Sequence, residues 1–150
     1  MGELEKILLT SSLTILGGVF VYAVGQIISK FFIDPIHRQG EIVGEIADAL
    51  IYYAQVWANP GGLRKELLDE ASGRFRQLAS LLRSKSYMIK WYELLQSLKL
   101  VPELSKVGEA SSSLIGLSNS LYNLTLDEGV DNFKRVEEIK KLLGIPSPKG

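Results

Sequence analysis

The feature that most constrains this chain is a run of 23 residues, 7–29, that contains no charged side chain. At roughly 1.5 Å of rise per residue the run makes a helix of about 35 Å, slightly longer than the roughly 30 Å hydrocarbon layer of a bilayer. Lys6 and Lys30 flank it and can extend their ammonium groups to the two interfaces. The run predicts a transmembrane helix, with residues 1–33 forming the span and its flanks.

Two other structures are compatible with the same run. A cleaved signal peptide would begin with a basic region, whereas two glutamates precede Lys6, and its apolar core would stop at the cleavage site, whereas apolar residues continue to Ile33. A buried helix of a water-soluble fold is the second alternative, although charge-free runs of this length are uncommon there. Both alternatives are weaker matches to the flanks and the length than a membrane span.

The orientation follows from the flanking charges. Upstream of the run, Lys6 stands against two glutamates, and downstream Lys30 and Arg38 follow closely, together with His37. The positive-inside rule counts Lys and Arg near the ends of a span. It predicts that the C-terminal part of the chain is cytoplasmic and that the protein lies in the cell membrane.

One face of the predicted span is small and polar, and the other faces are apolar. At about 100° per residue the members of this face fall within an arc of about 80°. Helices in lipid associate through close packing at small residues and through interhelical hydrogen bonds. The face predicts self-association or, in a ring of copies, a pore lining; a lone anchor that tolerates a few small residues is the alternative. Its members are Ser11, Thr14, Gly18, Tyr22, Gly25 and Ser29.

The remainder of the chain has helical periodicity and no convincing period-two alternation, which predicts an all-α fold. Asp34 is a suitable N-cap and Pro35 a suitable first helical residue. The helix that they begin is expected to reach about Ala58, because an Asn-Pro-Gly-Gly break follows at 59–62.

Further helices are expected over about 63–84, 87–100 and 102–121. Thr125 and Glu128 form a capping box that introduces a last helix, and Gly144 ends it. The predicted architecture is one N-terminal transmembrane helix, a bundle of four or five helices at 34–145, and a flexible tail at 146–150.

Motifs that carry catalysis are missing from the sequence. The chain has no cysteine and one histidine, His37, which excludes thiolate chemistry and makes a zinc site unfavourable. The serines between 111 and 120 have no histidine that could activate one of them as a nucleophile. The Arg–His pair of HEPN-class ribonucleases is absent, because no arginine precedes His37. Gly61-Gly62 is not followed by the Gly-Lys-Ser/Thr of a Walker phosphate-binding loop. We predict a non-enzymatic protein with no catalytic residue, metal or cofactor.

Charge is balanced over the whole chain, but residues 63–99 are net +4, with eight basic and four acidic side chains (8 − 4). A basic helix pair with Trp91 and Tyr92 nearby could bind anionic headgroups, RNA or a nucleotide. A solvated face balanced by acidic neighbours is the alternative, and the aromatic residues also fit the apolar periodicity. The candidate anionic-ligand face consists of Arg74, Arg76, Arg83, Lys85 and Lys90.

Several stretches resemble a set of small bacterial single-span proteins, at residues 32–36, 44–47, 50–54, 59–60 and 114–121. The layout is similar to that of the accessory membrane-pore proteins of type VI-B, RNA-targeting CRISPR systems. This resemblance implies one N-terminal span, a helical cytoplasmic domain and a ring-shaped homo-oligomer that perturbs the inner membrane in antiphage defence. We therefore expect a gated pore. The alternative is a membrane-tethered adaptor or ligand sensor whose bundle docks a protein, nucleotide or RNA partner.

Overall fold

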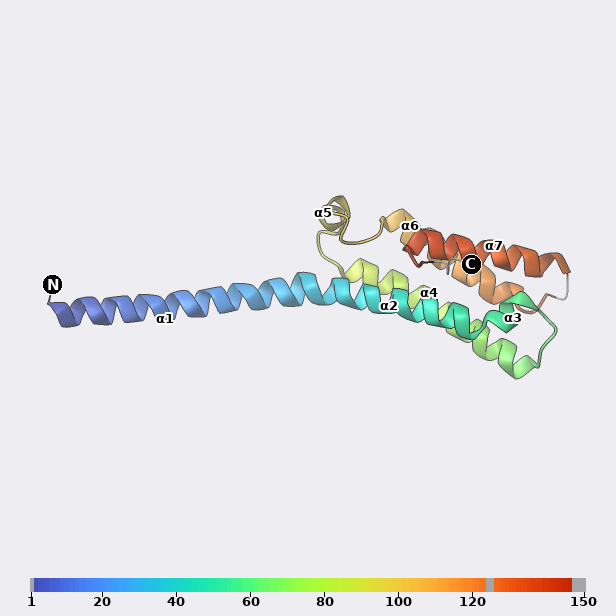
Figure 1. The fold of residues 1–150 in the computed structure, drawn as a ribbon, viewed down its shortest axis with the longest axis horizontal. Helices are drawn as coiled ribbons and strands as arrows, with labels where there is room; N and C mark the ends of the chain where they lie inside the picture. The colour runs from blue at the N-terminus through green and yellow to red at the C-terminus, as the bar shows by residue number, and fades with distance from the viewer. Residues whose placement is uncertain (1, 124–125, 147–150) are drawn as a thin grey trace. The chain divides into compact units, whose positions relative to one another are not determined.

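A computed structural model describes residues 2–123 and 126–146, and over these ranges the chain consists of helices and turns without a strand. The predicted all-α class is confirmed for this part of the chain. Two compact units, Met1–Asp34 and Pro35–Gly150, make up the molecule. The helices are α1 (Glu3–Ile28), the π-helical turn η1 (Ser29–Ile33), α2 (Asp34–Tyr52), α3 (Ala54–Ala58), α4 (Lys65–Met88), α5 (Tyr92–Ser97), α6 (Leu104–Ser120) and α7 (Leu126–Leu143) (Figure 1).

The first unit is built on α1, a helix long and apolar enough to span a membrane. Every residue of α1 is exposed, and none is buried against the rest of the described chain. Large apolar side chains such as Leu13, Phe20 and Val21 are 70% exposed or more. The helix therefore has an apolar surface that no described part of this chain covers.

The first unit ends in helical backbone rather than at a cap, and the N-cap predicted at Asp34 is wrong. Asp34 has φ −58° and ψ −45°, whereas an N-cap residue lies outside the helical region, and its N–H donates to the carbonyl of Ser29 five residues earlier. The reason is η1: its wider π-helical turn accommodates Pro35, which has no N–H and whose ring would clash with the carbonyl four residues back. Pro35 is thus an interior helical residue.

The second unit has a continuous apolar core. Helix α6 packs against both α4 and α7, and α3 contacts α4 and α7. Helix α2 contributes its amphipathic inner side, which the apolar spacing of its sequence predicts. The largest fully buried side chains in the described residues come from α2, α4 and α6, from α7 and from Leu121 next to α6: Ile46, Leu50, Phe75, Leu78, Leu82, Leu114, Leu117, Leu121 and Ile139.

The helix predicted to reach Ala58 is interrupted at Tyr53, which has φ −94° and ψ 21°. The indole of Trp57 explains the break. Its buried Nε1 donates to the carbonyl of Leu50 over 2.8 Å, and in an unbroken helix that carbonyl would accept the N–H of Ala54. Val56 and Trp57 instead donate their N–H groups to the carbonyl of Tyr53, which begins α3.

Two other boundaries differ from prediction. Helix α4 continues beyond residue 84 to Met88, and the helix expected at 87–100 is shortened to α5. Helix α4 is extended because Ser86 is buried and takes part in tertiary contacts instead of ending the helix. Helix α5 is bounded by Trp91 and Lys99, which both have positive φ and so cannot continue an α-helix on either side.

The glycine signals are confirmed. Gly61 has φ 71° in the predicted break, where its N–H donates to the carbonyl of Leu121 over 2.8 Å. Gly144 has φ 69° and follows α7 as its C′ residue, and the N–H of Ile145 donates to the carbonyl of Lys140 over 2.8 Å, the long bond of a Schellman motif. The capping box predicted at residues 125 and 128 and the tail predicted at 146–150 lie outside the described residues, except for the backbone of residue 128 and for residue 146.

A buried asparagine links three helices. Asn132 is fully buried, donates its Nδ2 to the carbonyl of Trp57 over 3.0 Å, and accepts at Oδ1 from Ser120 over 2.6 Å and from Arg135 over 2.8 Å. It lies on the inner stripe of α7, four residues before Val136. The network makes the α3–α6–α7 arrangement specific, because a buried amide without these partners would be unfavourable.

Candidate functional site

The small and polar face predicted for the span is exposed along α1. Five of its six residues belong to α1, and Ser29 is the first residue of η1. Apart from its chain neighbours and the backbone of its own helical turns, a Cβ added at Gly18 or Gly25 meets no described atom within 4 Å. The glycines therefore relieve no contact within the chain, and the space beside them is open to another helix.

The hydroxyl groups on this face differ in what they can offer. Thr14 donates its hydroxyl to the carbonyl of Thr10 over 2.8 Å, so only acceptor capacity remains for a neighbouring helix. Tyr22 is 68% exposed and carries the largest polar group of the face. Thr14 can therefore accept an interhelical hydrogen bond, and the hydroxyls of Ser11, Tyr22 and Ser29 can donate one.

The candidate anionic-ligand face is divided between two sides of α4. At about 100° per residue, Arg76 and Arg83 fall on one side of the helix, whereas Arg74 and Lys85 lie roughly opposite. Arg74 forms an ion pair with Glu45 of α2, with 2.8 Å between Nη2 and Oε2. Arg74 is therefore engaged in packing α4 beside α2 rather than available to a ligand.

The remaining two arginines of α4 have different surroundings. Arg76 donates its Nε to the hydroxyl of Ser118 over 3.2 Å and its Nη2 to Asn119, which ties α4 to α6. Arg83 is exposed, and no hydrogen bond or ion pair joins its guanidinium to a described residue. The Arg83 side chain extends over Gly108 of α6, and a Cβ added at Gly108 would lie 3.9 Å from its Nη2.

A groove of about 520 Å³ is lined by residues of α4 together with Ile115 of α6. Arg76 and Arg83 supply its positive charge, and Lys85 and Lys90 do not line it. Tyr87 also lines the groove and is 70% exposed. The structure thus brings together two of the five predicted cations, beside hydroxyl and aromatic groups. The lining consists of Arg76, Ala79, Ser80, Arg83, Ser84, Tyr87 and Ile115.

Two tyrosines serve as structural hydrogen-bond donors to carboxylates. Tyr53 is buried and donates to Glu70 over 2.8 Å, and its burial, followed by the neighbouring Glu70 carboxylate, raises the pKa of Tyr53 to about 12. The phenol therefore stays neutral at physiological pH. Tyr122 donates to Asp69 over 2.7 Å. Over the ranges that the structure describes, no three His, Cys, Asp or Glu side chains gather in a group that could hold a metal ion.

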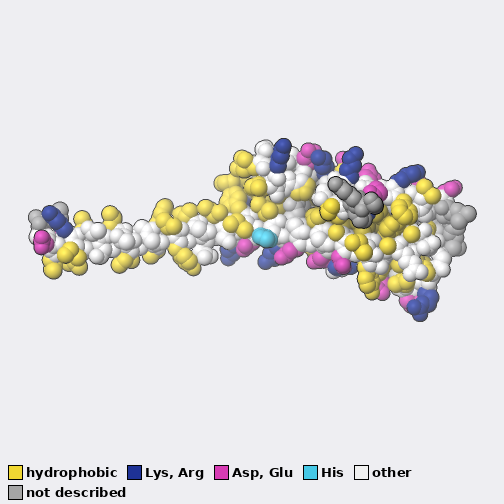
Figure 2. Space-filling view, viewed as in Figure 1, with side chains coloured by type: hydrophobic (Ala, Val, Ile, Leu, Met, Phe, Trp, Pro, Cys, Tyr) yellow, Lys and Arg dark blue, Asp and Glu magenta, His cyan; other side chains and the backbone are white. Residues whose placement is uncertain are grey.

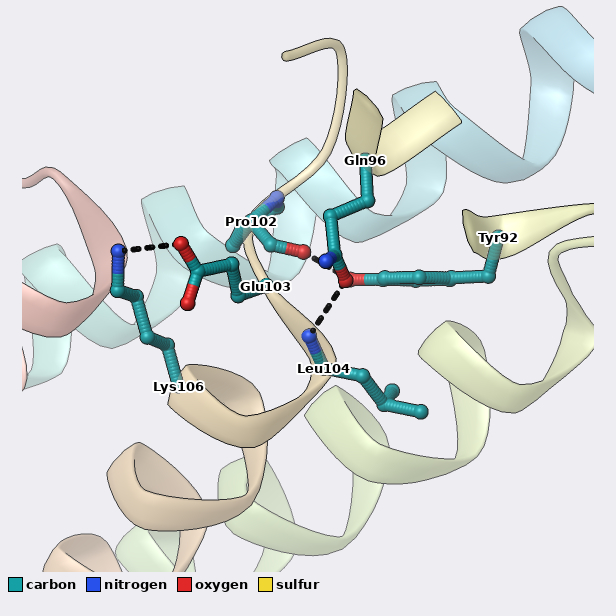
Figure 3. A network of polar contacts seen from close by, with 6 residues as sticks. All are labelled: Tyr92, Gln96, Pro102, Glu103, Leu104 and Lys106. Atoms are coloured by element: carbon teal, nitrogen blue, oxygen red, sulfur yellow. Dashed lines mark hydrogen bonds and ion pairs between the residues drawn. The ribbon is translucent and has the colours of Figure 1, made fainter. Parts of the chain in front are cut away.

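A polar network that the sequence did not suggest holds α5 in place. Gln39 of α2 is buried and donates its Nε2 to the hydroxyl of Ser86 over 2.7 Å and to the hydroxyl of Tyr92 over 3.0 Å. Tyr92 in turn donates to the carbonyl of Pro102 over 2.8 Å (Figure 3). Burial raises the pKa of Tyr92, so the phenol keeps the proton that it donates.

A second contact joins α5 to the start of α6. The N–H of Leu104 donates to Oε1 of Gln96 over 3.2 Å, and Lys106 forms an ion pair with Glu103 over 3.1 Å (Figure 3). The Gln96 side chain thereby satisfies one of the N–H groups that a helix leaves unpaired at its start. Helix α5 is thus fixed to α2 by a contact across 53 positions and to the start of α6 by a contact across eight positions.

No family model, curated protein or solved structure matches the chain. The features that can carry a function are therefore those of its own residues. They are an exposed apolar helix, a small and polar face on that helix, and a groove with two arginines.

Proposed function

We propose that this is a homo-oligomeric membrane protein that crosses the bilayer once through α1 and holds its helical bundle at the cytoplasmic surface. The observation that carries the proposal is that every residue of an apolar helix of membrane-spanning length is exposed. Removing one large apolar side chain from water contributes roughly 1.5–3 kcal/mol, and α1 exposes many of them. Hydrocarbon covers such a helix on all sides, whereas a core helix would be covered by its own chain.

Self-association of the span is supported by its small and polar face. Apolar side chains do not drive helices together in lipid, so contact depends on close approach at small residues. Gly18 and Gly25 are seven residues apart, two turns along the same side of α1, and each leaves open space beside the helix. A second copy of α1 can approach closely along this line.

We expect Gly18→Leu and Gly25→Leu to reduce the oligomer in mild detergent to smaller species, because each leucine fills the space that a neighbouring helix would occupy. The measurement is particle mass by light scattering with size-exclusion chromatography. Gly17→Leu is the matched control, since Gly17 lies about 100° away from Gly18 and also has open space around it. Native oligomer size in both Gly18 and Gly25 variants, or a monomeric wild type, would contradict the proposal.

The resemblance to the accessory pore proteins of RNA-targeting CRISPR systems suggests a specific form of this assembly, a ring whose spans form a gated pore in antiphage defence. Dye release from liposomes separates it from a membrane-tethered adaptor. A pore releases dye in proportion to the amount of oligomer, and the Gly18→Leu variant should release less. An adaptor releases none at any protein density.

A second candidate function, ligand sensing, is favoured by the groove beside Arg83. An exposed guanidinium without a partner among the described residues, next to Ser80 and the ring of Tyr87, suits a phosphate group attached to a flat apolar moiety. Nucleotides and single-stranded RNA have this chemistry. Arg76 could contribute only by giving up its contacts with α6.

If the groove binds such ligands, Arg83→Glu should weaken binding of fluorescently labelled ATP or a short labelled RNA by about 10- to 100-fold, the equivalent of one charge-assisted hydrogen bond. Lys85→Glu is the control, because it makes the same charge change on the other side of α4 and does not line the groove. Equal affinities in wild type and Arg83→Glu, or equal losses in both variants, would exclude the groove as the binding site.

A further inference from the structure

The segment around α5 exposes a group of large apolar side chains, here called the α5 patch. Its members are between 53% and 68% exposed. The opposite side of the segment is also apolar, with Ile89, Leu95 and Val101 buried in the domain. Hydrophobic side chains gather around α5 in the space-filling view (Figure 2). A helix that is apolar on its outer side as well as its inner side is not suited to water. The α5 patch consists of Met88, Trp91, Leu94, Leu98 and Leu100.

The backbone presents these side chains in an unusual way. Trp91 and Lys99 have φ of 56° and 57°, the positive φ values that the described residues show outside glycine. L-residues adopt the left-handed region at a conformational cost and do so where tertiary contacts hold them. Here the hydrogen bonds of Tyr92 and Gln96 to the start of α6 and the residues before it keep the segment in this conformation (Figure 3). The outward apolar side of α5 is thus imposed by the fold.

The patch lies close in space to the start of α2. Tyr92 accepts a hydrogen bond from Gln39, and Gln39 is six residues after Ile33, where the apolar N-terminal segment ends. Six helical residues rise about 9 Å. The headgroup region on each side of a bilayer is about 5–8 Å thick, half the difference between total and hydrocarbon thickness. The covalent chain therefore keeps Gln39, and α5 with it, within reach of the headgroups.

The charges around the patch are those of a membrane-surface segment. Lys85, Lys90 and Lys99 are interspersed with the apolar residues, and Glu93 is the acidic side chain between them, which gives residues 85–100 a net charge of +2 (3 − 1). Aromatic and aliphatic side chains with flanking lysines are typical of segments that lie in the interface of anionic bilayers.

We propose that the α5 patch inserts into the headgroup layer of the membrane that α1 crosses, so that the helical domain contacts the bilayer at a second point. This inference rests on the proposed membrane span. The occupant is the anionic lipid surface, because charge and reach both fit it. A second copy of the chain on the patch is an outcome that the test below distinguishes.

The chain offers a direct probe, because its two tryptophans are Trp57 and Trp91, and α1 contains none. Trp91 is 68% exposed and Trp57 is 7% exposed in the core. The full chain is reconstituted into vesicles with and without lipids brominated near the headgroup. The fluorescence of Trp91, taken as wild type minus Trp91→Phe, should fall about twofold or more with brominated lipid, and further with anionic than with neutral vesicles.

Leu94→Asp with Leu98→Asp should remove most of this quenching, because the carboxylates withdraw the patch from the bilayer. Ile51→Asp is the matched control, since Ile51 is 75% exposed but lies twelve residues further along α2 than Gln39. It should leave the quenching unchanged.

Retention of the chain in vesicles is measured first, by flotation. A chain that does not float overturns the membrane span itself. A chain that floats, but whose Trp91 is quenched by aqueous iodide and not by brominated lipid, overturns the α5 proposal alone. Protection of Trp91 from both quenchers also overturns it, in favour of a protein contact.

Discussion

Arginine at both Leu16 and Phe20 is expected to move almost all of the protein out of the membrane fraction. Both residues lie near the middle of the apolar run and are 66% and 70% exposed. At about 100° per residue they face away from the small and polar face, so they contact lipid even in an oligomer. One arginine at the centre of a span costs about 2.5–3.5 kcal/mol, and two, with the lost apolar side chains, total roughly 6–8 kcal/mol.

The measurement is the fraction of protein retained by membranes after alkaline carbonate extraction. An equivalent control is Ile51→Arg with Tyr52→Arg, because these residues are 75% and 72% exposed but follow the apolar run by more than twenty positions. That variant should be retained like the wild type. If the Leu16 and Phe20 variant is retained as well, or if carbonate already extracts the wild type, α1 is not a membrane anchor.

Phe75→Ala is expected to lower the free energy of unfolding of the helical domain by about 3–5 kcal/mol. Phe75 is fully buried in α4, and its ring meets the edge of Tyr53 with centroids 5.8 Å apart. Truncation leaves a cavity in the core that Phe75 shares with Tyr53, and the surrounding close-packed side chains cannot readily fill it. A domain of this size has a stability of about 5–15 kcal/mol, so the loss is a large part of the total.

Urea unfolding in mild detergent, followed by near-UV circular dichroism, measures this loss without a contribution from the helicity of α1. Tyr87→Ala removes an aromatic ring that is 70% exposed and should change the stability by less than about 0.5 kcal/mol. Similar stabilities of the two variants would mean that the α4 core face is not packed as described.

Local signals account for the parts of the structure that the sequence predicted. The all-α class, the break at 59–62 and the end of α7 at Gly144 each depend on residues close together in the chain. A positive φ at Gly61 or Gly144 needs only the absence of a side chain. The charge-free run likewise makes α1 long and apolar whatever the rest of the chain does.

The predictions that were wrong depend on hydrogen bonds and on covering neighbours that helical periodicity does not show. Asp34 is not an N-cap, because a π-helical turn precedes it and its own backbone is helical. The helix predicted to reach Ala58 is interrupted, because the Trp57 indole donates a hydrogen bond to the carbonyl of Leu50. Val130 and Phe133 fit the helical period of α7, yet they are 58% and 54% exposed. Spacing indicates which residues share a side of a helix but not which neighbour covers that side.

The candidate site divides in the same way. Helical spacing alone puts Arg76 and Arg83 on one side of α4 and Arg74 on the other. Only the tertiary structure shows that Arg74 forms an ion pair with Glu45, that Arg76 forms a hydrogen bond with α6, and that Arg83 is exposed in a groove.

The sequence by itself determined the apolar helix, its small and polar face and the helical class, because hydropathy and periodicity are properties of neighbouring residues. Tertiary structure decided the exposure of α1, the buried network of Asn132 and the outward side of α5. Burial and hydrogen bonding depend on which distant segments meet. Gln39 and Tyr92 are 53 positions apart, and no local pattern predicts that they share a hydrogen bond.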